Sequence, residues 1–171
     1  SLLFNKPYIW LRDFLEFYGD NLSASFWYVA GDSSLRYSIG NHGMFYVIEA
    51  PFFLLGFLVC FKRNRKLFIF LSAWILISVF PTALVGKSYG LRSIALLPIP
   101  MIFTSYGIVF FLDYFKQAKS KSLAIRMLFI VFAFSFTNWL VRYIYVYPVY
   151  GNYWYDGMQK EAINYAKNEE N

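Results

Sequence analysis

Four long apolar runs, joined by short polar connections, constrain this chain more than any other feature of its sequence. They cover residues 44–61, 67–85, 93–115 and 123–143. A helix needs about 20 mostly apolar residues to cross a bilayer. None of the runs alternates apolar and polar residues in the two-residue period of a barrel strand. We therefore predict an all-α protein, a polytopic transmembrane helical bundle with about four spanning helices plus short interfacial helices.

The composition excludes two other classes of protein. Hydrophobic residues make up 58% of the chain and charged residues 15%, whereas soluble domains have about 25% charged residues. This balance argues against a disordered chain and against an ordinary soluble enzyme. The single cysteine, Cys60, excludes an internal disulfide and a cysteine-based metal cluster.

The charges of the connections predict the direction in which the spans run. The connection at residues 62–66 carries four positive charges, and the one at 116–122 carries three lysines, followed by Arg126. Short loops rich in Lys and Arg stay on the cytoplasmic side, and the connection at 86–92 has only two cations. We therefore expect an integral membrane protein with both ends of the chain on the outer side.

The net charge of +6 follows from this orientation. Counting Arg126, the cytoplasmic connections hold eight of the 16 positive residues, and both flanks of the span region are slightly acidic. Nucleic-acid binding needs basic residues clustered on a polar face, so we expect no nucleic-acid partner.

The chain divides into an outer loop with an interfacial helix at 1–43, a four-span region at 44–146 and an outer C-terminal segment at 147–171. The last segment is expected to be the start of a truncated region. The N-terminus shows neither an initiator Met nor a signal-peptide pattern, so we expect this chain to be a piece of a longer protein.

Two short helices are predicted outside the spans. Residues 7–19 begin with a proline and end with a glycine, which suits a helix that lies along the membrane face or packs on the bundle. A second helix is predicted over 156–168, with Asp156 as its N-cap. The aromatic-rich segment at 143–155 suits the membrane–water boundary.

Two cations on the outer side, Lys87 and Arg92, are not explained by the orientation. An Arg side chain offers a planar fork suited to phosphate, and a helix N-terminus favours an anion shared with it. Pro98 and Pro100 remove two backbone donors and bend the helix, which opens space nearby. One interpretation is a lipid-phosphate clamp formed by Arg92 with help from Lys87. The alternative is an interfacial cation whose charged head reaches water.

Glu49 lies inside the first apolar run, two residues before Pro51. Ionisable residues at membrane depth usually face a cavity or a partner. Glu49 is therefore a candidate polar group of a substrate cavity or a partner for Arg92, and the alternatives are a structural ion pair or a hydrated, shallow position. Asp113, beside Lys116 at the other end of the third run, predicts an interfacial ion pair.

The outer loop before the first run carries Asp32, Arg36 and His42. An Asp and a His together can do general acid–base work or bind a metal. The alternative is an aspartate that stabilises the loop between Gly31 and Gly43. The sequence contains no Gly-rich phosphate loop, Ser-His-Asp set or zinc-ligand spacing.

Several short motifs follow one another in a fixed order. They are Gly31-Asp32 with Arg36, Gly43, Glu49-x-Pro51-Phe52, the basic hairpin, Pro81-Thr-Ala-Leu, Arg92 six residues before Pro98, Tyr106-Gly107 and Tyr155-Asp-Gly157-x-x-x-Glu161-Ala-Ile. This order, over residues 15–165, resembles the C-terminal membrane portion of bacterial family-39-type glycosyltransferases. These enzymes belong to the GT-C class, with protein O-mannosyltransferases and lipid A aminoarabinose transferase.

The resemblance implies an enzyme of the bacterial cytoplasmic membrane that takes a sugar from a polyprenyl-phosphate donor. The acceptor, on the outer side, would be a glycan, a lipid or a protein. It implies that Arg92 contacts the carrier phosphate, and that Asp32, Arg36 and His42 lie on the loop covering the cavity. The family's catalytic carboxylate lies in a first outer loop, which we expect to fall outside this chain. We therefore expect neither a catalytic residue nor a cofactor here, and a divalent metal would belong to the full enzyme.

Two other functions stay open at this stage. A transporter or flippase would explain prolines within the spans, although the middle of these spans offers few polar groups beyond Ser, Thr and Asn138. A non-catalytic membrane subunit that packs against a partner would explain the aromatic-rich outer flanks.

Overall fold

The computed structural model describes residues 6–32, 38–86, 93–154, 163 and 165–167. These residues form helices and no strand, which confirms the all-α prediction. The elements are α1 (Lys6–Leu22), the π-helix η2 (Ser25–Val29), α2 (Glu49–Arg63), α3 (Arg65–Val85), α4 (Pro98–Asp113), α5 (Ala118–Val141), the π-helix η3 (Arg142–Val146) and α6 (Tyr147–Trp154).

Two of these helices are long and apolar enough to cross a membrane. One is α3, with 21 residues, and the other is the apolar stretch Ala118–Val149, with 32 residues, which continues from α5 through η3 into α6. Both lie on predicted spans. By contrast, α2 has 15 residues and α4 has 16, and both are shorter than the apolar runs from which spans were predicted.

The first run is shortened because its start pairs with another segment. The backbone N–H of Phe45 donates to the carbonyl of Trp27 in η2, at 2.8 Å. Residues 44–48 therefore form no helix, and α2 begins at Glu49. The third run is shortened by its prolines, because Pro98 lacks an N–H and suits the first position of a helix.

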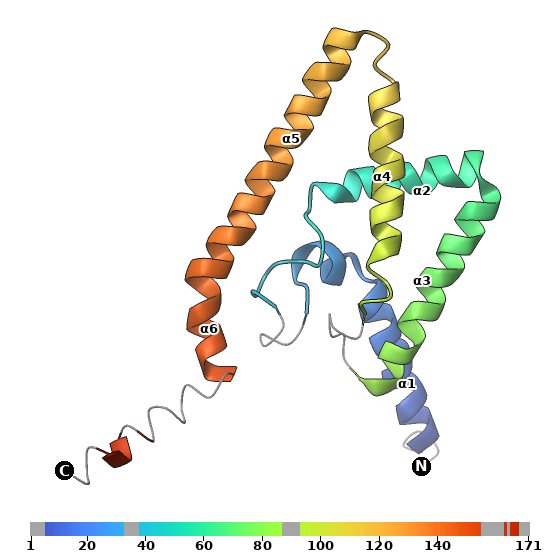
Figure 1. Cartoon of the computed structure of the whole chain (residues 1–171). Coiled ribbons are helices and arrows are strands. Elements are labelled where there is room, and N and C mark those ends of the chain that lie inside the picture. The colour runs from blue at the N-terminus through green and yellow to red at the C-terminus, as the bar shows by residue number, and fades with distance from the viewer. Residues whose placement is uncertain (1–5, 33–37, 87–92, 155–162, 164, 168–171) are drawn as a thin grey trace.

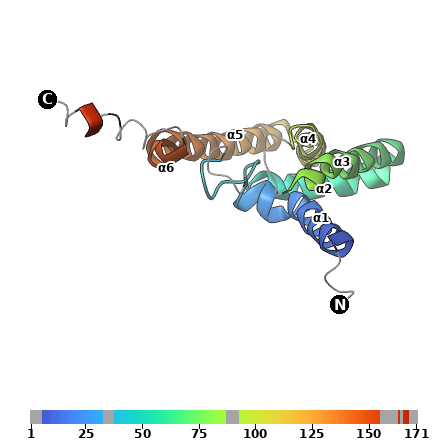
Figure 2. The same ribbon diagram turned by 90° about the horizontal axis from the view of Figure 1, so that it is seen from below.

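Figure 1 shows α2 lying across α4, and Figure 2 shows α4 between α3 and α5 when the molecule is seen from below. The crossing is close because Gly56 of α2 meets Gly107 of α4. A Cβ added to Gly56 would overlap the carbonyl of Phe103, and one added to Gly107 would overlap the carbonyl of Phe52. Small residues at such crossings let helix backbones approach closely.

Helix α1 matches the predicted short helix but is longer, and it packs on α3. The hydroxyl of Tyr18 donates to the carbonyl of Leu76 at 2.9 Å, and the rings of Phe14 and Phe80 meet edge to face at 5.3 Å. The second predicted short helix, over 156–168, falls mainly outside the described residues.

Asn21, at the end of α1, is fully buried and joins two distant segments. Its Nδ2 donates to the carbonyl of Phe17 at 2.7 Å, and its Oδ1 accepts the hydroxyl of Ser93 at 3.1 Å. Buried polar groups that lose their partners destabilise the fold more than exposed ones do.

Replacing Asn21 by leucine is therefore expected to lower the free energy of unfolding by about 1–3 kcal/mol, because the hydroxyl of Ser93 loses its acceptor. Thermal unfolding in detergent, followed by circular dichroism, measures the change. Gln117→Leu, an amide-to-leucine change at an exposed position, is the matched control. Equal stability of the two variants would contradict the structural role of Asn21.

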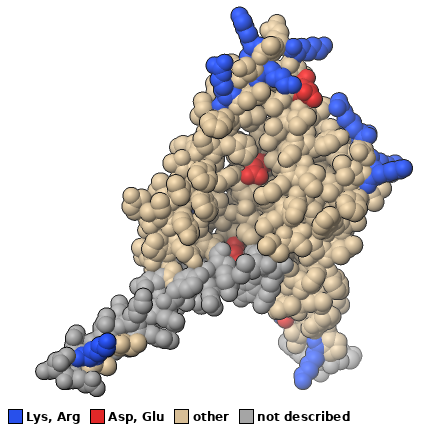
Figure 3. All heavy atoms as spheres, in the orientation of Figure 1, with Lys and Arg blue, Asp and Glu red and all other residues tan. Residues whose placement is uncertain are grey.

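The charged side chains agree with the predicted basic connections. In Figure 3, most of the blue side chains gather at the end where the α4–α5 hairpin and the α2–α3 corner lie.

The predicted partner of Asp113 is wrong, because its carboxylate pairs with Lys121 at 3.0 Å rather than with Lys116. Lys116 lies in the turn, whereas Lys121 lies one turn into α5 and reaches back to the end of α4.

Candidate functional site

A groove runs between α5 and the rest of the molecule, and it consists of three cavities in a row. The hairpin pocket has about 460 Å³ and is lined by Ile48, Phe52, Phe111, Phe115, Ser120, Leu123, Ala124, Met127, Leu128 and Val131. The central pocket has about 310 Å³ and is lined by Tyr28, Val29, Asn41, His42, Gly43, Phe45, Tyr46, Val47, Ile48, Phe134, Ser135, Asn138 and Arg142. The aromatic pocket has about 340 Å³ and is lined by Ser38, Ile39, His42, Gly43, Met44, Trp139, Tyr143 and Tyr147.

The three cavities are adjacent, because neighbouring cavities share lining residues. Ile48 lines both the hairpin and the central pockets, and His42 and Gly43 line both the central and the aromatic pockets. Across the groove, the rings of Tyr46 and Phe132 meet edge to face at 6.5 Å. The walls therefore change along α5, from apolar near the hairpin to polar and then aromatic.

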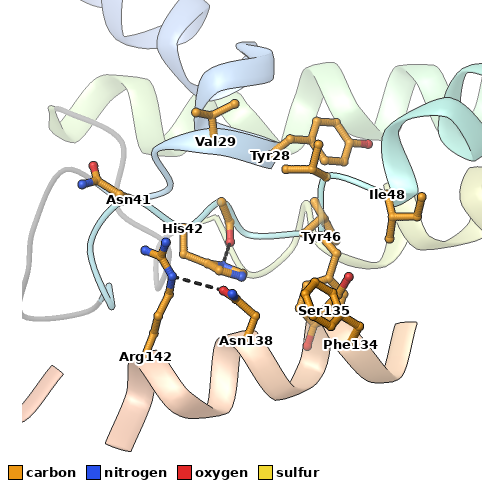
Figure 4. Close-up of a pocket in the computed structure, with 13 residues that line it drawn as sticks. Tyr28, Val29, Asn41, His42, Tyr46, Ile48, Phe134, Ser135, Asn138 and Arg142 are labelled. Atoms are coloured by element: carbon orange, nitrogen blue, oxygen red, sulfur yellow. Dashed lines mark hydrogen bonds between the residues drawn. The ribbon is translucent and has the colours of Figure 1, made fainter. Parts of the chain in front are cut away.

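Two polar side chains of the central pocket come from the long helix. The Nε–H of Arg142 donates to the Oδ1 of Asn138 at 3.2 Å, one helical turn away. Figure 4 shows both side chains rising from the helix towards the loop that carries His42. Within the described part of the chain, Arg142 has no carboxylate partner. Its guanidinium is thus a positive charge held in place and available to an anion.

His42 faces Arg142 across the central pocket (Figure 4). Its Nδ1 lies 2.7 Å from the carbonyl of Gly43, and because a carbonyl only accepts, Nδ1 carries the proton. In the neutral ring, Nε2 is then an acceptor. The ring also packs edge to face on Tyr46, at 5.8 Å.

The loop that carries His42 is held against η2 by two close backbone approaches. A Cβ on Gly43 would overlap the backbone of Tyr28, and a Cβ on Gly31 would overlap the carbonyl of His42. Asn41 has a φ of 49°, in the left-handed region that Asn tolerates better than most residues. These close backbone approaches therefore fix the position of His42 relative to η2.

Tyr28 lines the central pocket, and its buried hydroxyl points away from Arg142, towards the start of α2 (Figure 4). Its side chain is 8% exposed, and its hydroxyl has no hydrogen-bond partner among the residues that the structure describes. Burial raises the pKa of Tyr28 to about 12, and the negative charge of Glu49 adds to the rise. The hydroxyl therefore keeps its proton.

The structure describes some of the predicted site residues and not others, and only some of the described ones line the groove. Lys87, Arg92 and Arg36 lie outside the described residues, so the lipid-phosphate clamp of Arg92 with Lys87 stays a prediction, as does a pair between Arg92 and Glu49. Asp32 is buried and does not line the three pockets, whereas His42 lines two of them.

Glu49 does not line the groove either. Its carboxylate accepts the backbone N–H of Tyr46 at 3.3 Å, at the start of α2. A negative charge at a helix N-terminus is favourable because it meets the positive end of the helix dipole. Glu49 therefore lies in the first turn of α2 and holds the backbone just before it, and its charge acts on Tyr28, which lines the groove.

Arg142 and the aromatic wall were missed by the sequence analysis. Arg142 lies inside the fourth apolar run, one residue before its end, and was given no role there. A signal was present, because Asn138 and Arg142 are four residues apart and so share one helix face in an otherwise apolar segment.

Metal binding has no support in the described residues, where no group of three His, Cys, Asp or Glu side chains could hold an ion. No protein-family model matches the chain, and no match was found among curated proteins or solved structures.

Proposed function

We propose that this chain is the donor-binding membrane part of a glycosyltransferase that takes a sugar from a polyprenyl-phosphate carrier. The acceptor, a glycan, lipid or protein, would be reached on the outer side of a bacterial cytoplasmic membrane. The observation that carries the proposal is the order of surfaces along the groove, which is apolar near the hairpin and cationic at Arg142. A polyprenyl tail needs the first surface and a phosphate needs the second.

The length of the groove supports the match. Leu123 and Arg142 are 19 positions apart on one continuous helix, which places them about 28 Å apart along its axis. The hydrocarbon core of a bilayer is about 30 Å thick. The headgroup end of the groove would therefore lie near the outer interface when the hairpin lies near the inner one.

The charge distribution supports this direction. Both basic connections lie at the hairpin end of the molecule (Figure 3), where the positive-inside rule expects the cytoplasm. We propose that α3, α4 and the stretch Ala118–Val149 cross the membrane, whereas α2 lies across α4 (Figure 1) and does not run parallel to these helices. Arg142 is then a third outer cation, with Lys87 and Arg92, that orientation does not explain.

The chemical role of these cations would be to neutralise the leaving phosphate. Negative charge grows on the phosphate as the bond to the sugar breaks, and fixed positive groups in a dry site stabilise it. Arg142 supplies one such group in the described groove. No catalytic carboxylate is assigned to this chain.

The proposal is tested with a polyprenyl phosphate that carries a photoreactive group in its tail, bound to the protein in lipid nanodiscs. Crosslinks are expected on the hairpin-pocket residues of α5, such as Met127 and Val131, and an excess of unlabelled polyprenyl phosphate should remove them. A photoreactive phosphatidylcholine is the control. Crosslinks spread equally over α3, or equal labelling by both lipids, would reject the proposal.

The bare surface of α5 favours one alternative. None of the residues of α5 is buried, as expected for a helix that packs against another membrane protein as part of a non-catalytic subunit. Phe129, 74% exposed, tests this alternative when it is replaced by a photoreactive residue. Crosslinking of that position to one protein partner, without any binding of polyprenyl phosphate, would favour the subunit over the enzyme.

A further inference from the structure

We propose that His42 is the second ligand of a phosphate in the central pocket, and that its ring takes up a proton when the phosphate binds beside Arg142. The pocket should therefore bind phosphate more tightly as the pH falls from about 8 to about 6. The assignment of this phosphate to a polyprenyl carrier rests on the proposed function. The assignment of the pocket to an anion rests on its own geometry.

The central pocket offers hydrogen-bond donors and a positive charge, and none of its described lining residues is acidic. The Nε–H of Arg142 is taken by the Oδ1 of Asn138 at 3.2 Å, so the two terminal amino groups of the guanidinium remain for a ligand. The amide nitrogen of Asn138 adds a neutral donor beside them. Such a set of donors suits an anion with several oxygens, as a phosphate is.

The ring of His42 can change its charge without moving. Its Nδ1 donates to the carbonyl of Gly43 at 2.7 Å, a hydrogen bond that the neutral and the protonated ring both make. The proton is therefore gained or lost at Nε2, which accepts in the neutral ring and donates in the protonated one. Because the loop is fixed against η2, the ring keeps its place beside Asn138 and Arg142 in both states (Figure 4).

A bound phosphate favours the protonated ring. A phosphate oxygen next to Nε2 would meet the lone pair of the neutral ring, and it would accept the N–H of the protonated ring. A nearby negative charge and a hydrogen bond to the charged form both favour protonation. Each phosphate that binds therefore brings one proton from the solvent to His42.

The two positive charges match the two charge states of the proposed ligand. The phosphate of a lipid-linked sugar is a diester with one negative charge, and the monoester that remains without the sugar carries up to two. Arg142 balances the first charge, and the protonated His42 balances the second. The pocket is thus suited to hold the phosphate as its negative charge grows.

Few other side chains near His42 could titrate in the same pH range. Those that line the central and the aromatic pockets are Tyr28, Tyr46, Arg142, Tyr143 and Tyr147. Tyr and Arg titrate at about pH 10 and above. The carboxylates of the adjoining segments, Asp32 and Glu49, line neither cavity. His42 is the single histidine of the chain, so its variants identify its contribution.

The test measures the binding of a hexosyl polyprenyl phosphate to the protein in phosphatidylcholine nanodiscs at about pH 6 and about pH 8. The charge of this diester is constant over that range, so a change in affinity comes from the protein. We expect the affinity to be about tenfold higher at the lower pH, since the uptake of one proton changes it by at most about tenfold per pH unit.

Two variants assign the pH dependence. His42→Gln keeps an amide near the place of Nε2 but gains no proton, so its affinity should be the same at both pH values and about fivefold to tenfold below wild type at the lower one. Glu49→Gln removes a nearby carboxylate that does not line the pocket, and it should keep the pH dependence. A pH dependence that persists in His42→Gln would overturn the proposal.

A second measurement follows the proton in the wild type and needs no variant to fold. Histidine labelled with ¹³C at Cε1 gives one NMR signal in the untagged protein, because the chain has one histidine. At about pH 7 the signal should move towards the protonated position when the lipid is added. Inorganic phosphate at high concentration should move it in the same direction.

The two measurements separate the role of His42 from the proposed donor. If the lipid does not bind but inorganic phosphate moves the signal, the donor function fails and the phosphate site of His42 stands. If the lipid binds equally at both pH values and the signal stays in place, the role of His42 fails and the donor function stands.

Discussion

Replacing Arg142 by glutamine is expected to weaken the binding of polyprenyl phosphate by about tenfold to a hundredfold. The guanidinium lines the central pocket and is held by Asn138 at 3.2 Å, so its charge is positioned before the ligand arrives. A hydrogen bond to a charged group contributes about 1.5–3 kcal/mol, and 1.4 kcal/mol is a factor of about ten in affinity. Titration of nanodisc-bound protein with a fluorescent polyprenyl phosphate measures the loss.

Two further variants make this result specific. Arg12→Gln removes the same charge from an exposed site that is paired with the adjacent Asp13 at 2.7 Å, so it should leave the affinity unchanged. Arg142→Lys keeps the charge but loses the planar fork, and it should fall between wild type and Arg142→Gln. A loss of the same size in Arg12→Gln would show that net charge, rather than the groove, attracts the phosphate.

The sequence predicted those helices whose length and hydropathy depend only on their own residues. The length and hydropathy of α3 and of the stretch Ala118–Val149 depend only on their own residues, and so does the helical pattern of α1. The basic connections could be located in the same way, because charges in short loops are visible directly in the sequence.

The features of the fold that the sequence did not predict depend on contacts between segments far apart in the chain. Hydropathy counted residues 44–48 as the start of a span, but the N–H of Phe45 is taken by Trp27, 18 residues earlier. The crossing of α2 and α4 brings Gly56 to Gly107, 51 residues later. No periodicity within either helix reveals such a partner.

The candidate site was predictable only in part, for the same reason. His42 was named because an Asp and a His on one loop can do general acid–base work or bind a metal. Its neighbours in the groove include residues of α5, about a hundred residues later. The polar pair Asn138–Arg142 could have been noticed as one face of a helix. That this face meets the loop of His42 depends on the tertiary fold, and the π-helix η3 shifts the register of the helix directly after Val141.

Replacing Gly56 by alanine is expected to lower the free energy of unfolding by about 1–3 kcal/mol, as overpacking does in well-packed cores. The added Cβ would overlap the carbonyl of Phe103, which is backbone and cannot rotate away. The helices must therefore separate at their crossing. Unfolding in detergent, followed by circular dichroism at increasing temperature, measures the loss.

Gly19→Ala is the matched control, because Gly19 also lies inside a helix but nothing lies within 4 Å of an added Cβ there. Alanine favours a helix over glycine by about 0.5–1 kcal/mol, so this variant should be as stable as the wild type or more so. Equal destabilisation by both alanines would show that glycine flexibility, rather than close approach, matters at Gly56.

The double variant Gly56→Ala/Gly107→Ala separates a shared contact from two independent ones. Both glycines lie at the same crossing, where an added Cβ meets the backbone of the opposite helix. Once the first Cβ has moved α2 away from α4, the second finds part of its space already open. We therefore expect the double variant to lose less stability than the sum of the single variants, as residues in contact commonly do. Strict additivity would mean that the two helices do not separate as a unit, and the crossing would then not be the element that fixes α2 across α4.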